Sequence, residues 1–319
     1  MTKIAVVGAT GLVGRAFLRE IKRQGLVFDD AVLLASEKSA GKKTVFCGRE
    51  YVVEKTQKNS FKGVDIALFC AGSSVSKEFV PFALDSGAKV VDNSSFFRMK
   101  QDVPLVCSKI NLMQAKGKSL VANPNCSTLA VLPAVASLKK FGLKCVRYAT
   151  YQSVSGAGKK GLEDFFGTKK GFPPRYFCAD VSKNCIALIG EVLPDFYTEE
   201  ERKMQMETQK ILGLPSLGVS ATCVRVPVAF CHSVCCWVET LLPIGIKDAT
   251  TAFLAQNGVI LAQNGLPLAS GAKGKSETFV GRVRKDDACQ NGITFFCVAD
   301  NLFNGAASNA VEIARFLLE

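Results

Sequence analysis

The fold is decided by one stretch of sequence, Ile4-Ala5-Val6-Val7-Gly8-Ala9-Thr10-Gly11-Leu12-Val13-Gly14. The apolar run at residues 4–7 predicts a buried strand, and residues 12–24 carry apolar side chains at helical spacing. The glycines between them permit a tight turn and a close approach of the backbone to a phosphate group. A strand, a glycine turn and a helix in this order predict a dinucleotide-binding unit, with an ordinary tight turn as the alternative.

Further short apolar runs alternate with helical stretches along the first third of the chain. They predict strands at residues 31–35, 64–70, 90–92 and 120–122. This alternation is typical of a parallel, doubly wound sheet. The second strand leads into Ser36-Glu37-Lys38-Ser39, where serines and a lysine favour the 2′-phosphate of NADP, while Glu37 would suit the ribose of NAD and leaves the choice open.

Composition narrows the class of protein. The chain has 319 residues, of which 48% are hydrophobic, enough for two domains. Its 40 lysines and arginines outnumber 28 acids, giving a net charge of +12, but they are scattered and lack interleaved aromatics. Anionic small molecules therefore fit better than nucleic acid. No apolar run could span a membrane, and the 13 irregularly spaced cysteines, without a secretory segment, predict reduced thiols in a cytoplasmic protein.

One cysteine stands out, in the sequence Asn123-Pro124-Asn125-Cys126-Ser127-Thr128. It opens a predicted helix over residues 126–141, and backbone N–H groups at a helix N-terminus favour the nucleophilic thiolate. The chain has a single histidine, His232, so only this residue could serve as an imidazole partner for the thiol. The pattern predicts a cysteine enzyme that binds a dinucleotide.

The histidine also lies in a cluster of possible metal ligands, Cys231, His232, Cys235 and Cys236. Zinc is bound by such side chains at close spacing. However, residues 224–242 read as one strand, in which neighbours 231 and 232 point to opposite faces. The preferred interpretation is a functional histidine beside core cysteines, without a metal.

The second half of the chain has a different pattern. Residues 145–154 predict a strand, and the glycines that follow, at 156, 158, 161, 167 and 171, predict a long loop. A clear helix starts at Thr198, forms a capping box with Glu201 and stops at Gly213. Residues 306–318 are apolar at helical spacing and are expected to return to the first domain.

Within the helix after Thr198, Glu207 and Lys210 are three residues apart and fall on one face. Spacing alone favours an ordinary surface ion pair for these two residues.

Taken together, these motifs stand in the order found in the bacterial aspartate-semialdehyde dehydrogenases, which the whole chain resembles. The motifs are the glycine turn, Asn93 to Met99, the cysteine loop, Tyr151 to Gly158, Glu207 with Lys210, Arg225 to Val228, and Asp300-Asn301-Leu302. The resemblance implies an α/β protein with two domains. Residues 1–125 plus 303–319 would form a Rossmann-like, doubly wound NADP-binding domain, and residues 126–302 an α+β domain for catalysis, substrate binding and dimerisation.

The resemblance also assigns roles to single residues. It implies that Cys126 is the nucleophile, His232 the acid/base and Gln152 a residue that orients substrate or water. Substrate would be bound by Arg225 at its carboxylate, Glu207 at its amino group, Arg98 and Lys210 at its phosphate, and Asn125 beside the thiol. The cofactor would contact Gly8, Thr10, Gly11, Leu12, Val13, Ser36, Lys38, Ser39, Ser155, Gly156 and Asn301.

The implied reaction is the NADPH-dependent reductive dephosphorylation of L-aspartyl 4-phosphate to L-aspartate 4-semialdehyde. It would pass through a cysteine acyl-thioester, release inorganic phosphate, and serve lysine or diaminopimelate, threonine and methionine synthesis in a homodimer. The nearest alternative is an N-acetylglutamyl-phosphate reductase, which Asn125 and Glu207 disfavour. A non-catalytic NADP-binding sensor is the other, although a sensor would be expected to lack the nucleophile or the base.

A few positions depart from the pattern of the family. They are Ser108 and Lys109, Cys231 where glycine is usual, and Phe303 with Asn304. None of them is a residue assigned to chemistry, but Cys231 would restrict the backbone next to His232.

Overall fold

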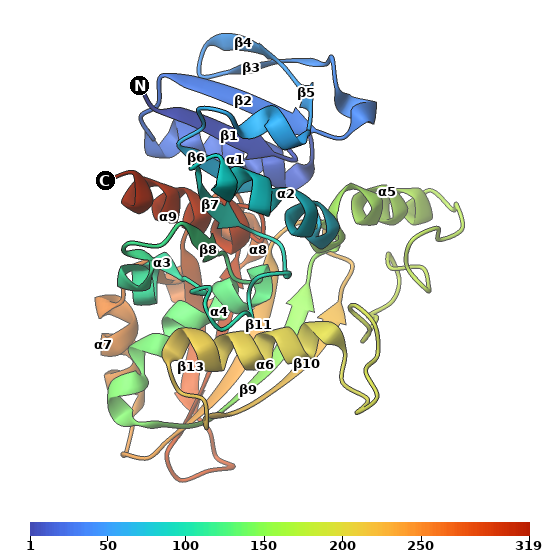
Figure 1. The fold of residues 1–319 in the computed structure, drawn as a ribbon. Coiled ribbons are helices and arrows are strands. Elements are labelled where there is room, and N and C mark those ends of the chain that lie inside the picture. Colours follow the sequence, from blue (N-terminus) through green and yellow to red (C-terminus); the bar gives the residue numbers. More distant parts are fainter. The chain divides into compact units, whose positions relative to one another are not determined.

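The computed structural model describes residues 1–319, which divide into two compact units (Figure 1). The first unit consists of Met1–Pro124 and Ala306–Glu319, and the second of Asn125–Gly305. No helix combines the length and the apolar character needed to cross a membrane.

The first unit is built on a six-stranded parallel sheet with the strand order β5-β2-β1-β6-β7-β8. Its elements are β1 (Lys3–Val7), α1 (Leu12–Gln24), β2 (Asp30–Ala35), η1 (Glu37–Ser39), β3 (Lys43–Phe46), β4 (Arg49–Val52), β5 (Glu54–Lys55), η2 (Lys58–Phe61), β6 (Ile66–Phe69), α2 (Ser73–Asp85), β7 (Lys89–Asp92), α3 (Ser108–Asn111), η3 (Leu112–Ala115), β8 (Leu120–Ala122) and α9 (Asn309–Leu318). Strands β3 and β4 form a separate hairpin. The predicted doubly wound sheet is confirmed.

Both faces of this sheet are covered. On one face, Ala5 and Val7 of β1 form a buried cluster with Val80 of α2. Successive side chains of a strand point to opposite faces, so Ile4 and Val6 face the other way, and both are fully buried as well. Helix α9 contacts α1, β6 and β7. Burial on both faces explains why the strands read as continuous apolar runs in the sequence.

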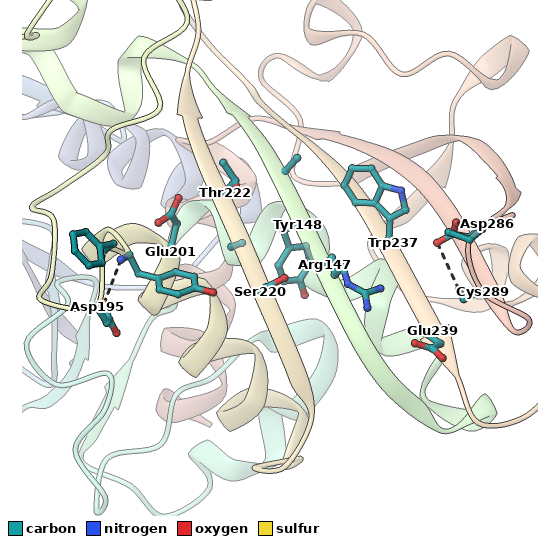
Figure 2. Close-up of a pocket in the computed structure, with 15 residues that line it drawn as sticks. Arg147, Tyr148, Asp195, Glu201, Ser220, Thr222, Trp237, Glu239, Asp286 and Cys289 are labelled. Carbon is teal, nitrogen blue, oxygen red and sulfur yellow. Dashed lines mark hydrogen bonds between the residues drawn. The ribbon is translucent and has the colours of Figure 1, made fainter.

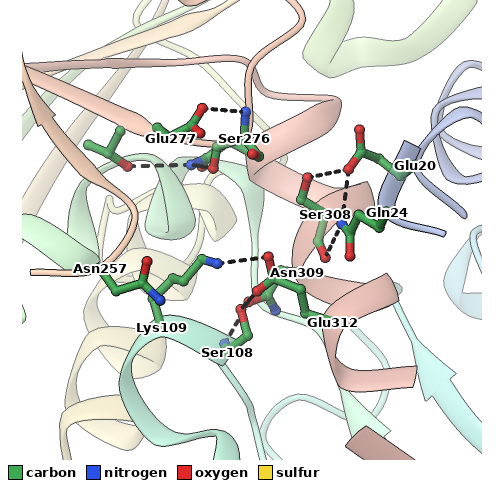
Figure 3. Close-up of polar contacts among 12 residues, drawn as sticks. Glu20, Gln24, Ser108, Lys109, Asn257, Ser276, Glu277, Ser308, Asn309 and Glu312 are labelled. Atoms are coloured by element: carbon green, nitrogen blue, oxygen red, sulfur yellow. Dashed lines mark hydrogen bonds and ion pairs between the residues drawn. The ribbon is translucent and has the colours of Figure 1, made fainter. Parts of the chain in front are cut away.

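Side-chain hydrogen bonds tie the segment Ala306–Glu319 to the rest of the first unit (Figure 3). Glu20 of α1 is fully buried and accepts a hydrogen bond from Ser308 Oγ at 2.7 Å. Burial raises the pKa of Glu20, but hydrogen bonds from Arg23, Ser308 and Gln24 outweigh it, and the net direction is downward. The buried carboxylate is therefore held in its charged form by its neighbours.

The departures Ser108 and Lys109 contribute to the same attachment. Ser108 Oγ donates to Glu312 Oε2 at 2.5 Å, and Lys109 Nζ lies 2.7 Å from Glu312 Oε1 (Figure 3). Asn309 Oδ1 accepts a hydrogen bond from the backbone N–H of Ser108 at 2.7 Å. These two residues therefore have a structural role between α3 and α9.

The second unit is built on a mixed six-stranded sheet with the order β10-β9-β11-β14-β13-β12. Its elements are α4 (Cys126–Ser137), η4 (Lys139–Phe141), β9 (Leu143–Gln152), η5 (Val154–Ala157), α5 (Gly158–Lys169), α6 (Glu199–Leu212), β10 (Gly218–Arg225), β11 (His232–Thr240), α7 (Ile246–Ala255), β12 (Val259–Leu261), η6 (Gln263–Gly265), α8 (Ala269–Ala272), β13 (Thr278–Lys285) and β14 (Gly292–Ala299), and a π-helical segment, η7 (Phe303–Ser308), follows. Helices α4, α6 and α7 pack against this sheet. The combination is the predicted α+β unit.

The strand predicted over residues 224–242 is interrupted. Strand β10 pairs in parallel with one edge of β9, whereas β11 pairs antiparallel with its other edge. Residues 226–231 carry the chain from one side of β9 to the other, so one continuous strand is impossible. Pro227, which has no N–H to give to a ladder, lies in this connection.

The predicted long loop after residue 154 is also wrong, because it contains helix α5. A Cβ at Gly161 would lie 2.4 Å from the carbonyl oxygen of Val154, so this glycine serves close packing rather than a turn. Helix α4 ends at Ser137, earlier than the predicted 141, and a 3₁₀ turn over Lys139–Phe141 tightens the end of it. The capped helix is confirmed: Thr198 and Glu201 form the capping box and Gly213 ends α6 in the left-handed conformation.

Candidate active site

Cys126 lies at the first position of α4, where the helix is capped by Asn125. The Asn125 backbone is extended, with φ −63° and ψ 145°, and its Oδ1 accepts a hydrogen bond from the backbone N–H of Ser127 at 3.4 Å. The Cys126 side chain is partly exposed. The free N–H groups of the first turn and the helix dipole both favour a thiolate at this position.

His232, the first residue of β11, faces the thiol. Its Nε2 lies 3.3 Å from Cys126 Sγ, and its ring is fully buried. The backbone N–H of Ser153 points at the other ring nitrogen, Nδ1, at 3.1 Å. A backbone N–H can only donate, so Nδ1 accepts and the hydrogen of the neutral ring is on Nε2, toward the sulfur.

The surroundings keep this imidazole neutral. Burial, and then the positive charge of Arg225, hold the pKa of His232 well below its usual range. A neutral ring with its hydrogen on Nε2 is a hydrogen-bond donor to whatever forms at the thiol.

Arg225, the last residue of β10, is 5% exposed. Its Nη1 donates to the carbonyl oxygen of Ser153 at 2.6 Å, and its Nε is buried without a hydrogen-bond partner. A Cβ at Gly156 would lie 2.7 Å from Arg225 Nη1 and 3.0 Å from His232 Cε1. Glycine at 156 therefore allows the backbone to pass directly over both side chains.

Asn301 supports the loop beside the histidine. Its Oδ1 accepts hydrogen bonds from Ser153 Oγ at 3.0 Å, Ser155 Oγ at 3.1 Å and the backbone N–H of Cys231 at 3.0 Å. Ser155 and Asn301, both predicted cofactor contacts, thus hold the segments on either side of His232.

Cys231 adopts a conformation that suits glycine. Its φ is +72°, in the left-handed region, and its thiol donates to the carbonyl oxygen of Ala269 at 3.3 Å. The Cys231 side chain belongs to a buried cluster with Ala272 and Val298, whereas His232 faces Cys126. Burial raises the pKa of the Cys231 thiol to about 12, which leaves it an unreactive core thiol.

Helix α6 brings two buried carboxylates to the cysteine loop. Glu207 Oε2 accepts a hydrogen bond from the backbone N–H of Asn125 at 2.7 Å, and Glu207 is 1% exposed. It is therefore not a surface residue, contrary to the simplest reading of its spacing. Lys210 lies three residues further along the same helix. Gln152, at the end of β9, is 1% exposed and donates from Nε2 to Glu200 Oε1 at 3.2 Å.

Arg98 belongs to the first unit. Its guanidinium is held by two carbonyl oxygens, with Nε 2.9 Å from that of Asn123 and Nη2 2.8 Å from that of Asn93. These contacts fix a cation, 8% exposed, after β7.

The glycine turn of the first unit borders a cavity of about 540 Å³. Among the predicted cofactor contacts, Gly8, Thr10, Gly11 and Ser36 line it, while Leu12 and Val13 start α1 and Lys38 and Ser39 lie on η1. A Cβ at Gly14 would lie 2.1 Å from the carbonyl oxygen of Gly8, so the turn requires glycine there. Glu37 also lines the cavity, and its Oε2 lies 3.0 Å from Lys55 Nζ.

Three residues at these sites were not found from the sequence: Glu200, Ser153 and Lys55. Glu200 reads as one of three acids in a helix first turn, and Lys55 lies in a two-residue strand. Ser153 contacts His232 and Arg225 through its backbone and Asn301 through its hydroxyl, and the backbone contacts have no side-chain signal in the sequence.

Comparison with known protein families first identifies the class of enzyme to which the chain is similar. The model of the semialdehyde dehydrogenase NAD binding domain matches residues 3–118, and that of the semialdehyde dehydrogenase dimerisation domain matches residues 135–304. The chain therefore contains both domains of a semialdehyde dehydrogenase.

Individual relatives narrow the class. The aspartate-semialdehyde dehydrogenase of Aquifex aeolicus is 42% identical, over 99% of this chain and 98% of that protein, and the Bacillus subtilis enzyme is 39% identical, over 98% and 96%. The crystal structure of aspartate semialdehyde dehydrogenase II from Vibrio cholerae, complexed with ASA, has a TM-score of 0.95 at 37% identity and covers 100% of this chain and 98% of that one. The chain belongs to the aspartate-semialdehyde dehydrogenase family.

Proposed function

We propose that this protein catalyses the NADPH-dependent reductive dephosphorylation of L-aspartyl 4-phosphate to L-aspartate 4-semialdehyde. Its full-length relatives carry the name of this activity. The observation that carries the proposal to this chain is the 3.3 Å pair of Cys126 Sγ and His232 Nε2 at the N-terminus of α4. The product would supply lysine or diaminopimelate, threonine and methionine synthesis.

In the proposed mechanism, the Cys126 thiolate attacks the acyl carbon of the substrate. A carbon–sulfur bond forms, the carbon–oxygen bond to the phosphate breaks, and inorganic phosphate leaves with the electron pair. Arg98 and Lys210 are proposed to bind the phosphate, whose departure requires positive charge nearby. When bound, the nicotinamide would supply the hydride for the acyl carbon; the carbon–sulfur bond then breaks, the semialdehyde leaves, and the electron pair returns to Cys126 as its thiolate.

His232 is proposed to stabilise the oxygen of the reacting carbonyl group. With Nδ1 accepting from Ser153, the Nε2–H is aimed at the sulfur and at any group bound to it. A fixed donor is effective where negative charge develops, because no reorganisation is needed during the reaction.

Three buried side chains are proposed to recognise the amino acid part of the substrate. Arg225 has a buried Nε without a partner, and a guanidinium can grip a carboxylate through two parallel hydrogen bonds. Glu207 is proposed to bind the amino group, while Gln152 and Asn125 are proposed to orient the substrate at the thiol. Burial lowers the pKa of Arg225 below its ordinary value, yet guanidinium remains charged in proteins.

The first unit is proposed to bind the dinucleotide at its glycine turn, and NADP rather than NAD. The cavity there adjoins Gly8, Thr10 and Gly11, where the backbone can approach a phosphate. The carboxylate of Glu37 is already paired with Lys55, which reduces its repulsion of a 2′-phosphate. Further predicted contacts are Leu12, Val13, Ser36, Lys38, Ser39, Ser155, Gly156 and Asn301.

The second unit matches a dimerisation domain, and the protein is a homodimer. One face of the sheet formed by β9, β10 and β11 carries Arg147, Thr222 and Trp237 and borders a cavity of about 1040 Å³ (Figure 2). We propose that this face meets the same face of a second copy. The cytoplasmic location stays a prediction from the sequence.

The reaction can be tested in reverse. Purified protein should reduce NADP when given L-aspartate 4-semialdehyde and inorganic phosphate, and Cys126→Ala should abolish this turnover. Turnover of N-acetylglutamate semialdehyde alone would identify the protein as an N-acetylglutamyl-phosphate reductase. NADP binding without turnover of either substrate would favour a non-catalytic sensor. The ratio of kcat/KM for NADP and NAD tests the cofactor choice, with Lys55→Ala expected to lower it.

A further inference from the structure

Glu200 lies in the first turn of α6 and is 8% exposed. A single oxygen, Oε1, accepts three hydrogen bonds: from Asn125 Nδ2 at 2.8 Å, from Ser127 Oγ at 3.2 Å and from Gln152 Nε2 at 3.2 Å. Its other oxygen, Oε2, lies 4.0 Å from Lys203 Nζ. The donors come from the two residues that flank Cys126 and from the end of β9.

A carboxylate determines how an amide next to it is oriented. It can only accept hydrogen bonds, so an amide side chain must turn its NH₂ group toward it. Asn125 then directs Oδ1 the other way, where it lies 3.3 Å from Cys126 Sγ and also accepts from Ser127 N–H. Gln152 likewise directs its carbonyl oxygen away from Glu200.

We propose that Glu200 is a positioning residue of this active site, whose carboxylate fixes the orientation of the Asn125 and Gln152 amides and so places a carbonyl oxygen beside the Cys126 sulfur. The proposal rests on the proposed function for its catalytic meaning. The orientation itself follows from the hydrogen bonds alone.

This orientation limits how strongly the site stabilises the Cys126 thiolate. The N-terminus of α4, His232 on β11 and Arg225 on β10 all favour negative charge on the sulfur. The Asn125 oxygen and the charges of Glu200 and Glu207 on α6 oppose it. An attacking thiol works best when its pKa lies near the ambient pH, because a strongly stabilised thiolate is a weaker nucleophile.

The test measures the rate at which iodoacetamide modifies Cys126 as a function of pH, in the dimeric protein without substrate. Modification is followed on the peptide that contains Cys126, since twelve other cysteines are present. In Glu200→Ala, Asn125 can turn its NH₂ toward the sulfur, so the midpoint should fall by about one pH unit. The kcat should fall about tenfold or more while KM for the semialdehyde changes little, because the reacting groups lose their orientation.

Two further variants make the result specific. Glu200→Gln can still present a carbonyl oxygen to all three donors, so kcat should recover to within a few-fold of wild type, while the lost charge still lowers the alkylation midpoint. Glu199→Ala removes a half-exposed acid from the same helix turn and should leave both quantities unchanged. A Glu200→Ala midpoint no lower than the Glu200→Gln midpoint, or an equal loss of kcat in the two variants, would overturn the proposal, and so would an equal shift in Glu199→Ala.

A variant that fails to fold can be distinguished from a failure of the proposed function. If Glu200→Ala does not fold, Glu200→Leu, which fills the same space and also accepts no hydrogen bond, takes its place in the comparison with Glu200→Gln. If the wild type turns over neither semialdehyde, the proposed function fails, whereas the alkylation profiles still decide the positioning role.

Discussion

The buried, neutral state of His232 makes the stability of this protein depend on pH in a defined window. His232 is the single histidine of the chain, and burial and Arg225 hold its pKa well below the ordinary value of 6.5. In the unfolded chain the ring binds a proton below about pH 6.5, whereas in the folded protein it does not. Acidification therefore favours the unfolded state, and the stability present above pH 6.5 is lost as pH falls.

The size of the effect follows from proton linkage. We take an unfolded pKa of about 6.5 and no protonation in the folded state. Relative to high pH, the unfolding free energy per protomer then falls by about 0.1 kcal/mol at pH 7.5, about 0.4 kcal/mol at pH 6.5 and about 1.4 kcal/mol at pH 5.5. Carboxyl groups with a lowered pKa, such as Glu20 and Asp164, also stabilise the folded protein. Their contribution is lost only as the pH approaches their pKa values in the unfolded chain, near about 4. Buried thiols with a raised pKa, such as Cys231, have an opposite effect of only about 0.1 kcal/mol each at pH 7.5. The difference between the wild type and a variant without the histidine therefore isolates His232 in the window from pH 7.5 to 5.5.

The measurement is urea unfolding at these three pH values, at one fixed protein concentration because the protein is a dimer. His232→Gln serves as the control, since it removes the titrating group and keeps a polar side chain. Across the window, the wild type should lose about 1.4 kcal/mol of unfolding free energy per protomer relative to the variant. A flat wild-type profile, or the same slope in His232→Gln, would refute the claim that the folded ring stays unprotonated.

Other expectations concern single backbone positions. Cys231→Gly should stabilise the protein by about 1 kcal/mol in thermal or urea unfolding, because φ is +72° there; a net loss would mean that the lost burial and the lost Ala269 contact outweigh the strain. Gly14→Ala should weaken NADP binding about tenfold or more by fluorescence titration, because its Cβ would meet Gly8 O at 2.1 Å, and unchanged affinity would argue against the proposed dinucleotide site. Thr198→Ala should cost about 1 kcal/mol of unfolding free energy through loss of the capping box, and no change would contradict that geometry.

Much of the fold could be predicted because its signals are local. The strand, glycine turn and helix at the start, and the capped helix ending at Gly213, depend on residues within a few positions of each other. The errors arose where tertiary geometry decides. Gly161 reads as a loop residue but serves helix packing, and residues 226–231 leave the sheet because β10 and β11 pair with opposite edges of β9.

The site shows the same division. Cys126 stands out because it opens a predicted helix, and His232 because it is the single histidine; the structure places Cys126 Sγ and His232 Nε2 3.3 Å apart. Glu200 reaches Asn125 across 75 positions and Gln152 across 48, and nothing in a row of acids predicts which one turns inward. Such a contact depends on how α6 is rotated against the sheet, which only the assembled unit defines.

The split of the first unit across the chain has a consequence for how the protein is made. Asn309 Nδ2 donates to Asn123 Oδ1 at 2.6 Å across 186 positions, and α9 packs on α1 and β7. On the ribosome, the contiguous second unit can complete its core while the first still lacks its closing helix. Truncation or a bulky fusion at Ala306–Glu319 would therefore destabilise the first unit, which contains the glycine turn, more than the second unit, although the second unit directly precedes this segment in the chain.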